Sequence, residues 1–393
     1  MIRLEVQYFG LNKILLLAIG LWPHQQSKLT RFQFIFLSSI LTTSIIFQLT
    51  SLITLRCTLD LVTKVVSSAS FFTVYLIHYN SFCINIKTVK NLLMELQHIY
   101  DELKDEREIA IIKKYGYNAK RYTAVLTAAA VCGISFTIIV QCLVNMFDVA
   151  LSVNISQPRR MQFVTEYFVD QEKYFFLILL HTNVAFCIGS AATIATGTML
   201  LGYLQLIFGM FKISSYRIER AVKINISQDI SLKNRISKSG NLMCAVDIHR
   251  EAMRLSKYLV TRFETMFLSL TVIFIISLCF NFLRIFQVVS SKEAIEEAFF
   301  PISFVFINIF YLFICNFCGQ NIIDHNNHVF ITAYSVQWYV APLHIQRMIL
   351  FLLLKGAKDF TIIVGGILVS SIQCFATLVK ASVSYFTVML SMV

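Results

Sequence analysis

The chain has 393 residues, of which 57% are hydrophobic and only 14% charged, and its formal net charge is +12. Soluble domains average about 45–50% apolar and about 25% charged residues, so the composition excludes an ordinary cytosolic or disordered protein. On a soluble chain the positive charge would suggest nucleic-acid binding. On so apolar a chain we first consider another cause, because membrane proteins place Lys and Arg asymmetrically in their loops.

Seven stretches of the chain lack Asp, Glu, Lys and Arg and are long enough to cross a membrane, which takes about 20 apolar residues. They are residues 32–55, 65–86, 122–147, 174–211, 265–283, 298–323 and 360–379. The fourth stretch is longer than one straight span requires. We therefore predict an all-α membrane protein with seven transmembrane helices.

Two further segments are apolar without being predicted spans. Residues 14–22 are too short to cross, and we expect a short helix lying at or dipping into the membrane face. Residues 325–354 lack acidic side chains but include three histidines, two asparagines, two glutamines and Arg347, so the segment is too polar for lipid. A helix packed against other protein fits this segment, with Pro342 breaking or kinking it.

The basic residues predict the orientation of the chain. The N-terminus and the second, fourth and sixth loops hold 26 Lys and Arg residues, and the other loops with the C-terminal segment hold 8. Basic loops stay in the cytoplasm, so the N-terminus is predicted to be cytoplasmic and the C-terminus extracellular. This topology is the reverse of that of a G-protein-coupled receptor. Asn154 then begins an Asn-Ile-Ser sequon in an extracellular loop and could carry a glycan.

Motifs for enzymatic chemistry are not apparent. Cys315 and Cys318 have the spacing of a redox or zinc pair, but no second pair follows, and we expect them to pack as small apolar residues. His325 and His328 are expected to form a polar cap where the sixth span ends. We predict no enzymatic activity, no cofactor and no metal site.

Aromatic and aliphatic residues gather in the outer halves of four spans, where helix ends can converge on one cavity. An aromatic and aliphatic lining suits a small volatile or lipophilic ligand, although lipid-facing and core positions also use Phe. The candidate lining residues are Phe71, Phe72, Tyr75, Ser135, Ile138, Ile139, Cys142, Phe176, Leu180, Val184, Phe300, Phe304 and Ile307.

The C-terminal third carries a recognisable pattern. It consists of Gly319, Tyr334, Trp338, Arg347, an apolar run at 349–354 followed by Lys355, then Phe375, Lys380 and the ending Ser384-Tyr385-Phe386. With the seven spans, the inverted topology and the short N-terminal apolar segment, the chain resembles the insect odorant receptor family along essentially its whole length. It departs from the family at 355–359, where no proline follows the basic residue. Loops shorter than those of the family's shared co-receptor favour a tuning subunit.

The resemblance implies an odorant-gated, non-selective cation channel that forms a tetramer with the co-receptor in the plasma membrane of a sensory dendrite. The last span would line the pore, with Val388 and Met392 as an apolar gate and Ser391 as a polar ring position. Tyr334, Trp338, Arg347, Lys380 and Tyr385 would serve anchoring and assembly.

The resemblance also divides the chain into four parts. They are an N-terminal cytoplasmic or interfacial segment at 1–31, a six-span ligand-binding bundle at 32–323, a cytoplasmic anchor helix region at 324–358 and a pore-lining last span at 359–393. A gustatory-type receptor channel and a G-protein-coupled receptor remain the alternatives. Nucleic acid is not an expected partner.

Overall fold

The computed structural model describes residues 4–25, 27–151, 163–227, 232–291, 295–356 and 360–392. The helices are α1 (Leu4–Tyr8), α2 (Gly10–Ala18), α3 (Lys28–Leu49), α4 (Ser51–Thr54), α5 (Leu59–Ile84), α6 (Ile86–Glu102), α7 (Glu106–Leu151), α8 (Phe175–Ser227), α9 (Leu232–Arg262), α10 (Glu264–Ser291), η1 (Ile295–Ala298), α11 (Phe299–Ser335), η2 (Trp338–Val340), α12 (Leu343–Gly356) and α13 (Ile372–Ser391). Two short strands, β1 (Ile363–Val364) and β2 (Leu368–Val369), form an antiparallel hairpin before α13.

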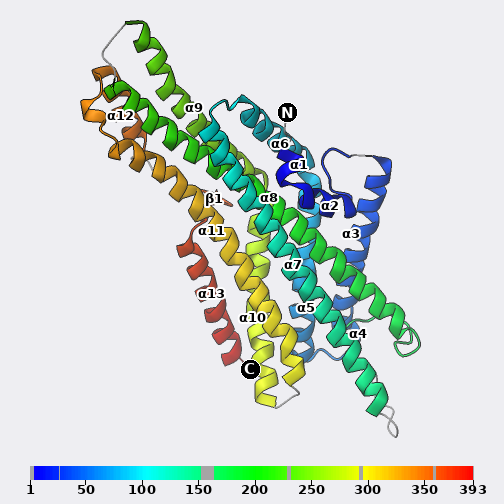
Figure 1. Ribbon diagram of the computed structural model, residues 1–393. Coiled ribbons are helices and arrows are strands. Elements are labelled where there is room, and N and C mark those ends of the chain that lie inside the picture. The colour runs from blue at the N-terminus through cyan, green and yellow to red at the C-terminus, as the bar shows by residue number, and fades with distance from the viewer. Residues whose placement is uncertain are drawn as a thin grey trace.

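Seven helical segments of the described chain are long and apolar enough to cross a membrane. They are α3 with α4, α5, α7, α8, α10, α11 and α13, and they run side by side in one bundle (Figure 1). The predicted fold class, an all-α protein with seven membrane-spanning helices, is confirmed.

Several of these helices continue well beyond a membrane. At 1.5 Å per residue the 53 residues of α8 extend roughly 80 Å, against a hydrocarbon thickness of about 30 Å. The projecting parts of α8 and α11 pack with α9 and α12 at the end of the bundle that also carries α6 and the N-terminus (Figure 1). We call this the basic end, because it holds the basic loops, and we call the end near the C-terminus the opposite end.

A buried ion pair fastens the basic end. Arg217 on α8 donates two hydrogen bonds of 2.7 Å to Glu108 on α7, whose side chain is 7% exposed. The third guanidinium nitrogen donates to the carbonyl of Cys244 on α9, at 3.1 Å. Bidentate arginine–carboxylate pairs fix geometry as well as energy, so one side chain sets the packing of three helices.

The N-terminal apolar segment 14–22 is helical only up to Ala18, where α2 ends. A second short helix, α1, precedes it. The inner face packs against α7 and α8, with Leu16, Leu21 and Trp22 buried. The Asn12 amide donates to Thr198 on α8 at 2.8 Å and accepts a hydrogen bond from Thr123 on α7. The segment is therefore part of the bundle's core and not only a membrane-surface helix.

The seventh span differs from its predicted bounds. The charge-free stretch 360–379 contains the hairpin, and the helix runs from Ile372 to Ser391 with Lys380 exposed on its surface. Gly365 and Gly366 make the turn because both have positive φ, +64° and +68°, a conformation that costs glycine least. Absence of charge identified the apolar segment here but not the start of its helix.

The polar segment 325–354 is not a single helix. Helix α11 continues without interruption from the sixth span to Ser335, a turn of 3₁₀ helix follows, and α12 begins at Leu343 directly after Pro342. The predicted break at Pro342 is thus present. His325 stacks on Phe208 with ring centroids 4.5 Å apart, and its Nε2 accepts a hydrogen bond from Tyr115. The histidine therefore packs against α7 and α8 inside the basic end.

Candidate ligand-binding site

Seven aromatic side chains converge in the opposite half of the bundle. We define this aromatic cluster as Phe71, Phe72, Tyr75, Phe163, Phe186, Phe300 and Phe304, which come from α5, α8, α11 and the segment that precedes α8. The ring of Phe71 stacks on Phe304 at 4.3 Å, and Phe186 lies 6.3 Å from the Phe71 ring. The other ring pairs join the cluster at 4.9–6.3 Å.

Tyr75 gives the cluster a polar group. Its hydroxyl forms a 2.7 Å hydrogen bond with the hydroxyl of Ser190 on α8. The ring lies so close to Gly189 that a Cβ there would come within 2.1 Å of the Tyr75 ring. Glycine at 189 therefore lets α8 approach α5, and the cluster combines apolar rings with one buried hydroxyl pair, as sites for lipophilic ligands do.

The local sequence explains how two of the helices deliver these rings. Helix α5 is the most buried span, so consecutive residues such as Phe71 and Phe72 can both face protein. Helix α11 begins at Phe299 with Pro301 in its first turn, where the missing N–H of proline costs no helical hydrogen bond. The helix start therefore fixes Phe300 and Phe304 one turn apart at the edge of the cluster.

The structure does not bring all the predicted lining residues together. On α7, Ser135, Ile139 and Cys142 are exposed and Ile138 is half-buried. On α8, Phe176, Leu180 and Val184 are 69%, 59% and 37% exposed. Ile307 lies at the rim of a deeper cavity described below. These residues lie outside the cluster. Of the predicted lining residues, Phe71, Phe72, Tyr75, Phe300 and Phe304 lie together in it, and their role in ligand binding stays a prediction.

The buried face of α8, and not the face that carries Phe176 and Leu180, contributes side chains to the cluster. Phe175, Ile178, Thr182 and Ala185 are buried, and Phe186 and Ser190 continue that face toward Tyr75. Sequence reasoning missed Phe186 and Ser190, although their spacing from Thr182 is helical. Phe163 was missed because it lies in a loop segment without periodicity.

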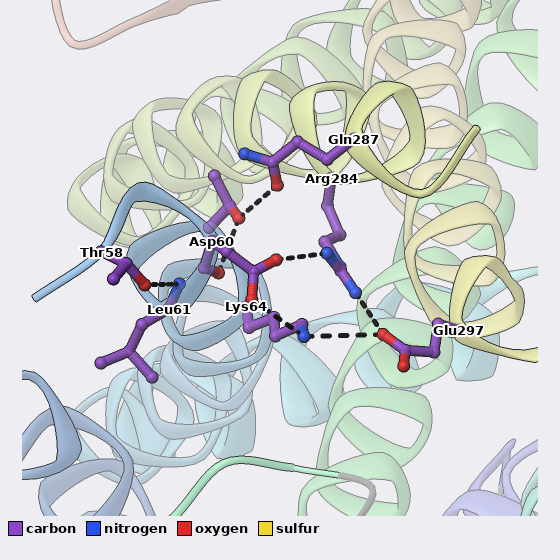
Figure 2. A network of polar contacts seen from close by, with 8 residues as sticks. Thr58, Asp60, Leu61, Lys64, Arg284, Gln287 and Glu297 are labelled. Atoms are coloured by element: carbon purple, nitrogen blue, oxygen red, sulfur yellow. Dashed lines mark hydrogen bonds and ion pairs between the residues drawn. The ribbon is translucent and has the colours of Figure 1, made fainter. Parts of the chain in front are cut away.

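A charged network lies next to the cluster at the opposite end of the bundle. Arg284 on α10, whose side chain is 3% exposed, donates to Asp60 on α5 at 2.5 Å and to Glu297 just before α11. Lys64 lies 3.0 Å from Asp60 and 3.6 Å from Glu297. Figure 2 shows the two cations between the two carboxylates. The Thr63 hydroxyl also donates a hydrogen bond of 2.8 Å to the Gln287 side chain. The network joins α5, which carries Phe71, to α10 and to η1, which directly precedes Phe300 on α11.

We expect Arg284→Met to lower the free energy of unfolding by about 2 kcal/mol. Removing one partner of a fully buried pair costs about 3–5 kcal/mol, and the carboxylates of Asp60 and Glu297 are 47% and 40% exposed, which reduces the loss. Thermal denaturation of the detergent-solubilised protein measures the effect. Arg121→Met, at an exposed position on α7, is the matched control, and equal midpoints for the two variants would contradict the structural role of the network.

The residues predicted for gate and assembly lie elsewhere. On α13, Val388 and Tyr385 are 49% and 59% exposed, and Ser391 and Lys380 are also exposed. Met392, the C-cap residue of this helix, is 81% exposed. Only Leu378 and Ser382 of α13 are buried. At the basic end, Tyr334 and Arg347 are exposed and Trp338 is half-buried. Asn154 lies outside the described residues.

Comparisons with known proteins found matches to both the sequence and the architecture of this chain. A family model described as 7tm Odorant receptor matches residues 58–383. The insect olfactory receptor OR5 from Machilis hrabei has a similar structure, with a TM-score of 0.75 at 15% identity over 99% of this chain and 98% of that one. The same receptor in complex with eugenol matches at 16% identity with the same TM-score and coverage. No curated protein matches. At these identities the structural likeness establishes only the fold, and the family model, which matches most of the chain, establishes the family.

Proposed function

This chain belongs to the odorant receptor family, and from that premise we propose that it is the odorant-sensing subunit of a ligand-gated, non-selective cation channel. The observation that carries the proposal is the aromatic cluster, in which seven rings meet inside the bundle. The rings come from α5, α8, α11 and the segment with Phe163 that precedes α8. A related fold has been solved with eugenol, a small aromatic molecule. The ligand of this chain is a small volatile or lipophilic molecule that enters the aromatic cluster.

The contacts between α10, α11 and α13 provide a route from ligand to pore. Phe304 in the cluster and Phe313 lie on the same helix, and Phe313 packs edge-on against Phe375 of α13 at 5.6 Å. A second contact joins Phe282 of α10 to Phe386 at 5.8 Å, and the Cys279 thiol donates to the carbonyl of Ser382. A ligand that binds better when these helices move apart would shift the population toward the open pore.

The exposed face of α13 supports its role as the pore helix. Val388, Ser391 and Met392 follow at i, i+3 and i+4, and all three face away from the rest of the chain. In a tetramer with the co-receptor this face would meet its counterparts around a central pore. Val388 and Met392 then form an apolar constriction and Ser391 a polar ring, through which cations pass when the constriction widens.

We expect Met392→Ala to increase the basal current or alter ion permeation, because a smaller apolar side chain widens the constriction. Whole-cell recording of the basal current and of relative cation permeabilities measures the effect. Ser384→Ala, at an exposed position on the same helix, is the matched control. Unchanged currents and selectivity in both Val388→Ala and Met392→Ala would remove these residues from the pore.

The proposed orientation places the basic end in the cytoplasm and the C-terminus outside, in the plasma membrane of a sensory neuron. The segments 1–31 and 324–358 are then cytoplasmic, the latter forming an anchor domain with its counterparts through Tyr334, Trp338 and Arg347. Residues 32–323 form the ligand-binding bundle and 359–393 the pore segment. An epitope placed before residue 4 is expected to be labelled only after permeabilisation. Labelling of intact cells would favour a G-protein-coupled receptor instead.

An odorant panel on cells that express this chain with the co-receptor tests the function. At least one small lipophilic odorant is expected to evoke an inward cation current that neither subunit gives alone to that odorant. A gustatory-type channel would instead give robust current from this chain without the co-receptor, and that outcome would contradict the tuning-subunit role.

A further inference from the structure

A cavity of about 240 Å³ lies deeper in the bundle than the aromatic cluster. Helices α8, α10 and α11 form its walls, and the hairpin with the first turns of α13 forms its floor. None of the seven cluster residues lines it. Its nearest lining residues, Thr193 on α8 and Ile307 on α11, lie three residues beyond Ser190 and Phe304, roughly 4.5 Å along each helix axis, so the cavity begins about one turn deeper than the cluster.

The lining of this cavity is mostly apolar, with a few hydroxyl-bearing side chains. Phe274, Leu368 and Leu378 represent the apolar majority. Thr193 on α8 contributes a buried hydroxyl without a hydrogen-bond partner among the described residues, and Tyr311 contributes another hydroxyl-bearing side chain. An engineered cavity of roughly 150 Å³ lined by Leu, Ile and Phe stays dry and binds benzene, so a larger cavity of this character favours an organic molecule over water.

The cavity also has an entrance and an unfilled position in its wall. Ile307 and Phe310, which line it, are 43% and 44% exposed on the flank of α11, so the cavity opens sideways from the bundle. On the opposite wall, a Cβ added to Gly197 of α8 would meet no atom within 4 Å. The glycine therefore leaves space where any larger side chain would project.

We propose that this deep cavity is a second binding site, which takes one small apolar molecule of about the size of a substituted benzene with its polar group toward Thr193. A small odorant-type molecule and the end of a lipid acyl chain are both apolar and of suitable size, so either could be the occupant. Because Leu368, Cys374 and Leu378 line the floor, the occupant contacts the root of α13 and adjusts its position. Binding is independent of the proposed channel function, and only the effect on gating rests on it.

Cys315 reports on occupancy, because its thiol lines the cavity. The experiment measures the rate at which N-ethylmaleimide modifies Cys315 in the full-length chain, resolved by mass spectrometry, with Cys132 on the exposed face of α7 as internal reference. One arm adds eugenol as the probe to delipidated protein in detergent. A second arm compares that protein with the chain in lipid nanodiscs without a probe.

We expect eugenol, nanodisc lipid or both to slow modification of Cys315 at least threefold relative to Cys132. Protection by eugenol identifies a small-molecule source, and protection by nanodisc lipid alone identifies an acyl chain. Gly197→Leu fills the cavity and removes the dependence on occupant, whereas the matched Gly133→Leu, with open space around its Cβ on α7, preserves it. Equal rates in all arms of the wild-type chain would overturn the proposal, whether or not odorants evoke current.

Discussion

Gly319→Leu is expected to reduce the amount of receptor at the cell surface to roughly a tenth of wild type or less. A Cβ at position 319 of α11 would lie 2.1 Å from the Ser370 hydroxyl oxygen and 2.6 Å from the Ser370 carbonyl oxygen. The second atom belongs to the backbone, so relief requires the hairpin to move. Overpacking of a core costs about 1–3 kcal/mol, occasionally more, which is a large fraction of a stability of about 5–15 kcal/mol.

The hairpin has little room to give way. The Ser370 hydroxyl donates to the carbonyl of Cys315, and on its other side a Cβ at Gly365 would already contact Leu268 of α10 at 3.0 Å. The hairpin therefore packs between α10 and α11, directly before α13. Surface biotinylation compares Gly319→Leu with Gly133→Leu, which makes the same change at an open position of a spanning helix. Equal surface levels for the two variants would contradict this packing.

Phe71→Ala is expected to raise the odorant concentration for half-maximal current about 10- to 100-fold. Phe71 is 4% exposed and its ring contacts Tyr75, Phe186 and Phe304, so its removal takes away the wall that a bound ligand would share. Aromatic pairs are worth about 0.5–1.5 kcal/mol each beyond area burial, and each 1.4 kcal/mol is a factor of ten in affinity.

Phe176→Ala is the matched control for that variant. Both residues were predicted to line the site, but the Phe176 ring is 69% exposed on the outer face of α8. Its removal is expected to leave potency unchanged. Dose–response curves normalised to surface expression distinguish the two, with Phe71→Leu as a milder change that guards against misfolding. A shift for Phe176→Ala as large as that for Phe71→Ala would place the ligand outside the aromatic cluster.

The contrast between α5 and α8 shows which residues of the candidate site can be predicted from the amino-acid sequence. About 67% of the most apolar window of α5 is buried, so aromatic residues chosen there nearly all face protein. Helix α8 is apolar on every side, and hydrophobic periodicity cannot then distinguish its inner face from its outer one. The sequence therefore predicted Phe176 and Leu180, which are exposed, and missed Phe186, which lies in the aromatic cluster.

The seventh span shows a different limit. Charge-free length located the other six spans, because a charged residue in lipid is costly. In the last span that criterion stopped at Lys380, although this side chain is exposed on α13 and the helix continues to Ser391. The criterion also included the Gly365-Gly366 turn, which ends any helix through its backbone and not through charge.

The measurement that tests the central claim most directly is a recording from excised outside-out patches of cells that express this chain with the co-receptor, in solution without nucleotides. A channel that is itself gated by odorant is predicted to open in the patch when an active odorant is applied, and to close when it is washed away. Odorant responses that occur in whole cells but are lost in every excised patch, and return only with GTP, would contradict the account.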